Sequence, residues 1–193
     1  MGQELDAAHY DGVWKRGGHR GIYHLPHRQS PYHALWMVGV EHVKALRPQR
    51  VIDLGCGSGH FAELLAGAAE FDFSYVGYDF SPVAVEIATR RLSADARFRF
   101  EVQDLTSDLA LEPAMYVSFE FMEHIESDLG VLSRLPPGSQ VCLSVPSYDS
   151  AGHVRHFDSG EAANARYGSL IEVGEIREVG SPKMFVVFGR RGG

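Results

Sequence analysis

A glycine-rich turn between an apolar run and a helical pattern is the part of this chain best suited to chemistry. The segment VIDLGCGSGHF, residues 51–61, holds Gly55, Gly57 and Gly59. Such a turn exposes backbone N–H groups at the positive end of a helix dipole, and glycines let a ligand touch the main chain. Asp79 ends the next apolar run, 20 residues after Gly59, where similar turns have a carboxylate for ribose hydroxyls. The pattern predicts a cofactor that contains a nucleoside.

The charge around the turn narrows the kind of cofactor. A dinucleotide fingerprint, GxGxxG, would need a glycine where His60 stands, and a Walker-type lysine is absent. No Lys or Arg occurs between Val51 and Thr89, and Asp53 directly precedes the turn. A carboxylate there repels phosphate and attracts a cation. An α-ammonium or a sulfonium group therefore fits better than a pyrophosphate.

Five segments, in order along the chain, resemble the motifs of the class I S-adenosylmethionine-dependent methyltransferases. DLGCGSG resembles the first motif, and the others are YVGYDFS (75–81), VQDLT (102–106), YVSFEFMEHI (116–125) and LPPGSQVCLSVP (135–146). The resemblance covers roughly residues 50–146. It implies S-adenosylmethionine as cofactor and S-adenosylhomocysteine as product, with Asp79 on the ribose and Asp104 near the adenine amine. The implied cofactor-binding residues are Asp53, Gly55, Cys56, Gly57, Gly59, Asp79, Phe80, Asp104, Leu105, Glu120 and Phe121.

Strand and helix patterns alternate from residue 50, which predicts an α/β fold with parallel βαβ units. We expect a Rossmann-like three-layer sandwich with a mostly parallel seven-stranded sheet and a C-terminal antiparallel hairpin. The hairpin follows from SLIEVGEIREV and KMFVVFGRR, which Gly180-Ser181-Pro182 joins. The resemblance implies that the last strand inserts before the sixth. Strands are predicted near 50–54, 75–79, 97–102, 115–120 and 139–145, and helices near 59–69, 82–93 and 127–135.

We interpret residues 1–193 as a single methyltransferase domain. Residues 1–48 form an N-terminal lid and substrate segment, 49–146 the cofactor-binding core, and 147–193 a substrate loop and the terminal hairpin. The aromatic residues Tyr10, Trp14, Tyr32 and Trp36 are expected to close over the cofactor, with Arg28 or a tyrosine hydroxyl meeting its carboxylate. The alternative is that these rings only pack on the edge of the sheet.

Three histidines are candidate catalytic residues. His124 follows the fourth strand, and His153 and His156 lie in the loop after the fifth. A histidine could remove a proton from the methyl acceptor; the alternatives are a packing role for His124 and a solvated surface for the loop histidines. We expect no metal site, because no ligand close in the sequence completes a set with His153 and His156.

Composition limits the partners. The net charge of −7 makes nucleic acid an unlikely partner, no apolar run approaches 18 residues, and no secretory signal is visible. The two cysteines, Cys56 and Cys142, are expected to be small buried residues in a reducing compartment. We therefore expect a cytoplasmic protein without membrane contact, as a monomer or homodimer.

The resemblance and the small size favour methyl transfer to a small-molecule amine or hydroxyl. The [DN]PP[YF] tetrapeptide of enzymes that methylate nucleic-acid amino groups is absent, and FEFM (119–122) stands in its place. YDGVW and SPYHALW resemble small bacterial N-methyltransferases of the nodulation type. Two alternatives stay open: a catalytically silent partner subunit that binds S-adenosylmethionine, or a methyltransferase that acts on RNA or protein. A hydride-transfer enzyme is the weakest alternative.

Overall fold

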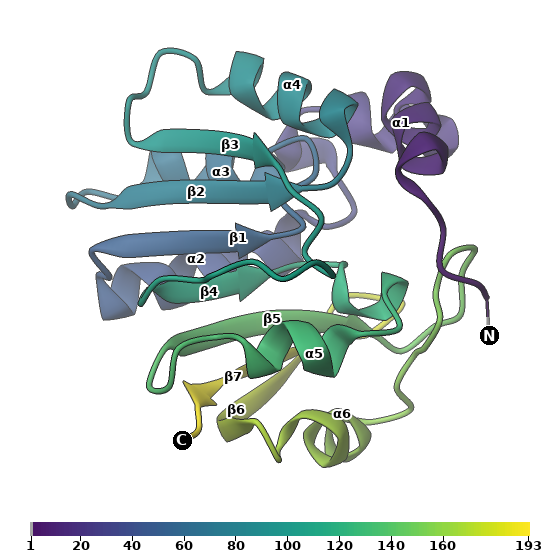
Figure 1. Ribbon diagram of the computed structural model, residues 1–193. Helices are drawn as coiled ribbons and strands as arrows, with labels where there is room; N and C mark the ends of the chain where they lie inside the picture. The colour runs from purple at the N-terminus through teal and green to yellow at the C-terminus, as the bar shows by residue number, and fades with distance from the viewer. Residues whose placement is uncertain (1) are drawn as a thin grey trace.

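A seven-stranded sheet in the order β3-β2-β1-β4-β5-β7-β6 forms the centre of the computed structural model, which describes residues 2–193 (Figure 1). The first five strands pair in parallel, and β7 lies antiparallel between β5 and β6. The predicted fold class and the inserted last strand are confirmed. The strands are β1 (Arg50–Leu54), β2 (Ser74–Asp79), β3 (Phe98–Val102), β4 (Met115–Ser118), β5 (Gln140–Pro146), β6 (Ile171–Val179) and β7 (Met184–Arg191).

Helices cover both faces of the sheet, which gives the three layers (Figure 1). On one face, apolar residues of α2 (His33–Leu46) and α3 (His60–Ala68) pack against the sheet, beside α4 (Pro82–Arg91). On the other face, apolar residues of α5 (Asp128–Ser133) and α6 (Gly160–Tyr167) pack against the sheet. Neighbouring residues of β1 show the alternation, because Val51 joins the first core and Ile52 the second.

Local sequence signals place several element boundaries. The Ser81 hydroxyl accepts the Ala84 N–H at 3.2 Å, and Pro82 opens α4, as expected of a capping serine followed by proline. Gly174 interrupts the apolar alternation of β6, and it forms a bulge there, seen as a register shift between Val173 and Glu175 in the β6–β7 pairing. β4 ends at Ser118, two residues earlier than predicted. The chain turns there through Glu120, whose φ is 55°, into the short helix η3 (Met122–His124).

The N-terminal segment contains a helix that the sequence analysis did not predict. α1 (Ala7–Arg16) begins after Asp6, whose side chain accepts the His9 N–H, and ends at Gly17 with a φ of 76°. Two short helices, η1 (His19–His24) and η2 (His27–Gln29), lead from it to α2. α1 lies beyond the carboxyl ends of the parallel strands, beside α4 (Figure 1). The sequence of α1 is polar and none of its residues is buried, so it shows no apolar core pattern.

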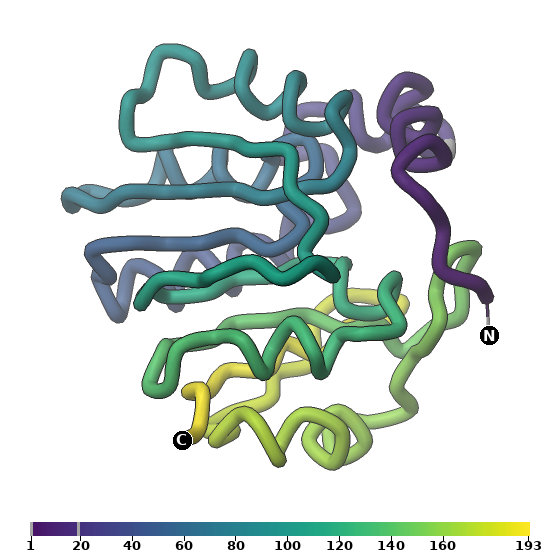
Figure 2. Tube along the Cα trace, viewed as in Figure 1, coloured from purple at the N-terminus to yellow at the C-terminus, as the bar shows by residue number. Residues whose placement is uncertain are grey.

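The chain ahead of α1 crosses to the loop after β5. The Gly2 N–H donates to the His153 carbonyl at 2.7 Å, and the Glu126 N–H donates to the Glu4 carboxylate at 2.7 Å. Figure 2 shows this N-terminal stretch running beside the loop of residues 147–159. The two segments predicted to face the substrate are therefore neighbours. Among the helices of residues 2–193, none has the length and apolar character to cross a membrane.

Candidate active site

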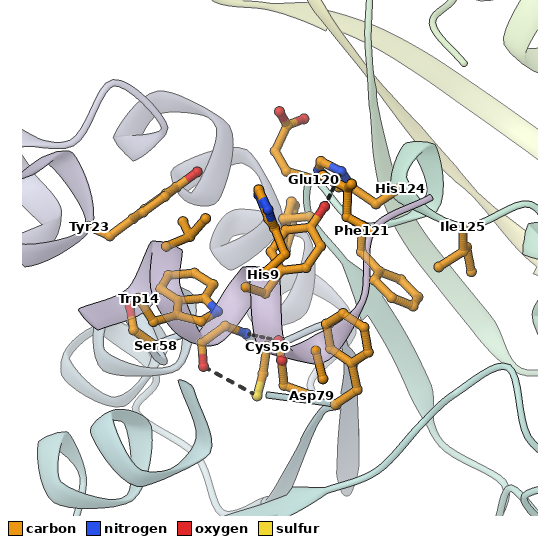
Figure 3. A pocket seen from close by; sticks show the side chains of 18 of the residues that line it. His9, Trp14, Tyr23, Cys56, Ser58, Asp79, Glu120, Phe121, His124 and Ile125 are labelled. Atoms are coloured by element: carbon orange, nitrogen blue, oxygen red, sulfur yellow. Dashed lines mark hydrogen bonds between the residues drawn. The ribbon is translucent and has the colours of Figure 1, made fainter. Parts of the chain in front are cut away.

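A cavity of about 1140 Å³ lies where β1, β2 and β4 end, under α1 (Figure 3). Open α/β sheets bind ligands at this edge. Ten of the eleven residues predicted to contact the cofactor line it: Asp53, Gly55, Cys56, Gly57, Asp79, Phe80, Asp104, Leu105, Glu120 and Phe121. So do all four aromatic residues of the predicted lid: Tyr10, Trp14, Tyr32 and Trp36. The fold thus gathers residues from most of the chain around one space.

The carboxylate of Asp79 organises the glycine turn. One oxygen accepts the Gly57 N–H at 2.9 Å, and the other accepts the Ser81 N–H at 2.9 Å. Asp79 is 8% exposed, and burial raises its pKa to about 6 although both hydrogen bonds act against the rise. Each oxygen can accept a further bond from the cavity. Asp79 is therefore placed to receive hydroxyl donors while it holds the turn.

Gly57 lies directly under the Trp14 ring of α1. Its φ is 52°, and a Cβ there would come within 2.8 Å of the Trp14 ring. Both the backbone conformation and the close approach therefore require glycine. The indole lies over the turn in Figure 3.

Gly59 is the predicted cofactor residue that does not line the cavity. Its φ is 78°, and a Cβ there would lie 3.0 Å from the Ala88 Cβ of α4. The glycine lets the start of α3 approach α4, a packing role that motif spacing alone could not separate from ligand contact.

Asp53 is almost completely buried below the turn. It is 2% exposed, and it accepts a hydrogen bond from the Tyr75 hydroxyl. Burial raises its pKa to about 7, and the neighbouring Asp79 adds to the rise. Asp53 thus lines the cavity, while the buried Tyr75 holds its carboxyl group in place.

The outer wall of the cavity combines apolar rings with one exposed carboxylate. Phe121 packs over Gly55, where a Cβ would lie 2.6 Å from the ring. Asp104 is exposed, and one of its oxygens accepts both the N–H and the hydroxyl of Thr106, at 2.8 and 2.7 Å. Apolar walls and a terminal carboxylate can hold a flat aromatic base that carries an amino group.

Glu120 faces a group of tyrosines on the other side of the cavity. It accepts the Tyr148 hydroxyl at 3.0 Å and the Ser144 hydroxyl at 3.4 Å. Burial raises its pKa to about 7, against the effect of these hydrogen bonds. Tyr23 and Tyr32, stacked at 6.5 Å, line the same region. This side of the cavity therefore offers a carboxylate and hydroxyl groups to a polar ligand.

Two of the three candidate histidines meet in the structure. His124 and His153 line the cavity with ring centroids 4.8 Å apart, and the Tyr10 hydroxyl lies 2.8 Å from His124 Nδ1. Burial lowers the pKa of His124 to about 4, so the imidazole is neutral at physiological pH. His156 is exposed and outside the residues that line the cavity, so we leave it out of the proposed site. Arg28 is also exposed and outside, whereas Arg16 lines the cavity.

A family model described as "Methyltransferase domain" matches residues 28–178, most of the chain. The chain belongs to the class I S-adenosylmethionine-dependent methyltransferases. The match begins after α1 and ends within β6, so it covers the glycine turn, Asp79 and Asp104.

Sequence relatives of this methyltransferase carry different names. A ubiquinone biosynthesis O-methyltransferase of Xanthomonas campestris pv. campestris (strain B100) is 29% identical over 127 residues, which are 60% of this chain and 52% of that protein. A trans-aconitate 2-methyltransferase of Rhizobium leguminosarum bv. trifolii (strain WSM2304) is 28% identical over 148 residues, 74% of this chain and 56% of that protein. The chain spans about half the length of these curated relatives.

Among solved structures, the N-methyltransferase NodS from Bradyrhizobium japonicum WM9, in complex with S-adenosyl-L-homocysteine, is similar to this methyltransferase. The TM-score is 0.63 at 16% sequence identity, over 80% of this chain and 84% of that chain. At this identity the likeness shows a shared fold.

The cavity of this methyltransferase fits S-adenosylmethionine. Gly57 adds no side chain of its own beneath the Trp14 ring, Asp79 presents acceptor capacity, and the cavity volume exceeds the roughly 300–1000 Å³ of an ordinary ligand site. Space therefore remains for a second, small molecule.

Several cavity residues carry no signal in the sequence. Tyr148 lies in a loop and belongs to no motif, and only the tertiary fold brings it to Glu120. The contact of Tyr10 with His124 spans 114 positions of sequence and has no local signal either. The aromatic composition of residues 1–48 was the usable clue, and it pointed to the lid as a whole.

Proposed function

We propose that this protein transfers a methyl group from S-adenosylmethionine to an amine or hydroxyl of a small molecule. One observation carries the proposal: a single cavity holds the glycine turn with Asp79 on one side and Glu120, His124 and a group of tyrosines on the other. When bound, S-adenosylmethionine supplies a methyl group activated on a sulfonium. The chain's own residues then have to bind and orient the cofactor and the methyl acceptor, and to enclose both away from water.

The cofactor side is assigned to the turn and its surroundings. Asp79 accepts the ribose hydroxyls, and Asp104 accepts the adenine amino group between the rings of Phe80 and Phe121. Asp53, Gly55, Cys56, Gly57 and Leu105 complete this side. Gly59 contributes by letting α3 and α4 pack, without touching the ligand.

The acceptor side is assigned to Glu120 and the groups beside it. Glu120 lines the cavity and has a hydroxyl partner already in place, so it can accept a hydrogen bond from the acceptor's amine or hydroxyl. This revises the cofactor role predicted for Glu120. His124 and His153 stand next to it as orienting groups. Because the leaving group is activated by the cofactor, positioning and exclusion of water are the main tasks of these residues.

Residues 1–48 act in this proposal as a lid, and the loop of residues 147–159 as the opposite wall. The hydrogen bond from Gly2 to His153 and the contact of Tyr10 with His124 support that assignment, since they join the two segments over the cavity. A roof of this kind admits a small acceptor more readily than an RNA or a protein side chain. The names of the two relatives agree with small acceptors.

The test combines binding and turnover. Isothermal titration should show one site for S-adenosylhomocysteine and none for NAD. A radioactive methyl-transfer screen over amines, phenols and small carboxylic acids should then give a labelled product. Binding without any product, including with RNA and protein substrates, would favour a catalytically silent partner subunit. Oligomeric state and cytoplasmic location stay predictions.

A further inference from the structure

A cluster of potential metal ligands lies at the acceptor side of the cavity. Glu123, His124 and His153 each offer one ligand atom, and these atoms lie within 4.8 Å of one another. Glu123 and His124 belong to η3, and His153 lies in the loop after β5. The sequence analysis expected no metal site because it sought ligands near His153 along the chain. The fold supplies two from about 30 positions earlier.

The carboxyl group of Glu123 is buried without a partner. Glu123 is 0% exposed, and neither of its side-chain oxygens has a hydrogen-bond partner among residues 2–193. The guanidinium of Arg155 donates instead to the carbonyls of Met122 and Ile125, and it pairs with Asp128 at 3.3 Å. A buried polar group with no partner is costly. Glu120 is its neighbouring carboxyl, so a cation beside Glu123 would supply the missing partner and offset the repulsion between the two groups.

The backbone orients both imidazoles. His153 Nδ1 lies 3.2 Å from the Tyr148 carbonyl, and a carbonyl oxygen can only accept, so this contact favours the tautomer in which Nδ1 carries the proton and Nε2 presents its lone pair. His124 Nδ1 lies 3.1 Å from the Gly152 carbonyl and 2.8 Å from the Tyr10 hydroxyl; the same tautomer holds where Nδ1–H donates to the carbonyl and the hydroxyl accepts beside it. A backbone carbonyl behind the imidazole is the usual support of a metal-binding histidine.

The backbone fixes the two halves of the cluster to each other. The Val154 N–H donates to the Glu123 carbonyl at 2.8 Å, and the His153 N–H donates to the Ser150 carbonyl at 3.0 Å. The imidazole rings of His124 and His153 meet edge to face. The three side chains are therefore brought together by main-chain contacts that do not depend on a ligand.

We propose that Glu123, His124 and His153 bind one divalent transition-metal ion at the wall of the cavity. Two imidazoles and one carboxylate suit Zn²⁺, Mn²⁺ or Fe²⁺, whereas Ca²⁺ and Mg²⁺ prefer oxygen ligands. Ligand atoms around such an ion stand about 3 Å apart, so the side chains have to move inward by about 1 Å. Both histidines line the cavity, which leaves the remaining coordination positions open to water or to an acceptor.

The experiment uses the full chain after treatment with a chelator and without cofactor. Isothermal titration with ZnCl₂ and with MnCl₂ should show one ion per chain. Glu123→Gln and His153→Gln should each weaken binding at least tenfold. His156→Gln is the matched control, because His156 is exposed and lies three residues from His153 in the same loop; it should bind as the parent does. Thermal unfolding without metal checks that each variant is folded.

A second readout needs no variant. Addition of CoCl₂ to the parent protein should give visible absorption bands that saturate at one equivalent and disappear with excess ZnCl₂. The absence of Co²⁺ absorption bands would overturn the proposal. So would equal metal affinity in the parent and in the Glu123 and His153 variants, or a loss of metal affinity in His156→Gln as large as theirs. Tighter binding of Mg²⁺ or Ca²⁺ than of Zn²⁺ or Mn²⁺ would also contradict it. Binding of S-adenosylhomocysteine by the chelated protein is measured in parallel. Its loss would count against the proposed function, and its persistence beside failed metal binding would overturn the metal site alone.

Discussion

The Asp79 carboxylate accepts the backbone N–H of Gly57 at 2.9 Å, so the end of β2 holds the turn that follows β1. The residue assigned to the cofactor's ribose is thereby also a structural support of the loop beneath the cofactor. Substitutions at Asp79 must therefore be interpreted with both tasks in mind.

Asp79→Ala should weaken S-adenosylhomocysteine binding roughly 10- to 100-fold: a hydrogen bond to a charged acceptor is worth about 1.5–3 kcal/mol, and water that enters the site compensates for part of the total loss. Asp79→Asn keeps one carbonyl acceptor and should lose less. Titration calorimetry measures both. Asp108→Ala, an exposed aspartate outside the cavity, is the control. Parent-like affinity in Asp79→Ala would remove Asp79 from the proposed site.

Cofactor affinity should depend on pH through Asp79. Burial raises the pKa of this group to about 6 in the free protein, and the ionised carboxylate is the better acceptor. Affinity for S-adenosylhomocysteine should therefore rise as the pH goes from 5 to 7, by up to about tenfold per unit below the pKa, and level off above 7. Asp79→Asn should flatten the curve. An unchanged slope in that variant would assign the titration to another group.

Stability should fall as the pH rises, through Asp53. Burial raises the pKa of Asp53 from 3.8 to about 7, so the folded state binds the proton more tightly than the unfolded state. This contribution to the free energy of unfolding is complete below about pH 4 and is lost as the pH rises through 7. Urea unfolding at several pH values should show a flatter profile for Asp53→Asn than for the parent. Asp108→Asn should keep the parent's slope. If the free energy of unfolding of Asp53→Asn depended on pH as steeply as that of the parent, the raised pKa of Asp53 would be contradicted.

Three glycines should respond differently to alanine. Gly59→Ala should lower the free energy of unfolding by about 1–2 kcal/mol or more, since its φ is 78° and a Cβ meets Ala88. Gly57→Ala places a Cβ only 2.8 Å from the Trp14 ring at a φ of 52°, so it should displace that ring and also weaken cofactor binding. Gly67, exposed in α3 with nothing within 4 Å of a Cβ, is the control and should gain about 0.5–1 kcal/mol. Equal effects at Gly57 and Gly59 on cofactor affinity would contradict the separate roles.

Trp14 should report cofactor binding by fluorescence. The chain has two tryptophans, and Trp14 lies over Gly57 while Trp36 stacks on His60 at 5.3 Å. Titration with S-adenosylhomocysteine should change the emission of the parent and of Trp36→Phe. The change should be largely lost in Trp14→Phe. A full response in Trp14→Phe would place the lid away from the bound cofactor.

The sequence by itself determined the fold class of this protein and many of its element boundaries. The alternation of apolar strand and amphipathic helix predicts the parallel sheet, because both patterns depend on neighbours close in the chain. The turn residues, the cap at Ser81-Pro82 and the bulge at Gly174 are local in the same sense. The glycine turn and Asp79 were also predictable, since their spacing follows from one βαβ unit.

Only the tertiary structure decided how the cavity is enclosed and which polar groups face one another. α1 carries no core pattern, so its place over the turn depends on its contacts with α4 and on the segment ahead of it, where Gly2 bonds to the loop after β5. Gly57 and Gly59 look alike in a motif, yet one lies under Trp14 and the other against Ala88. Glu123, His124 and His153 come together across about 30 positions, through the main-chain hydrogen bond from Val154 in the loop after β5 to Glu123 in η3. Contacts of that range leave no periodic trace in a sequence, because they depend on where separate elements are packed rather than on the order of residues within one.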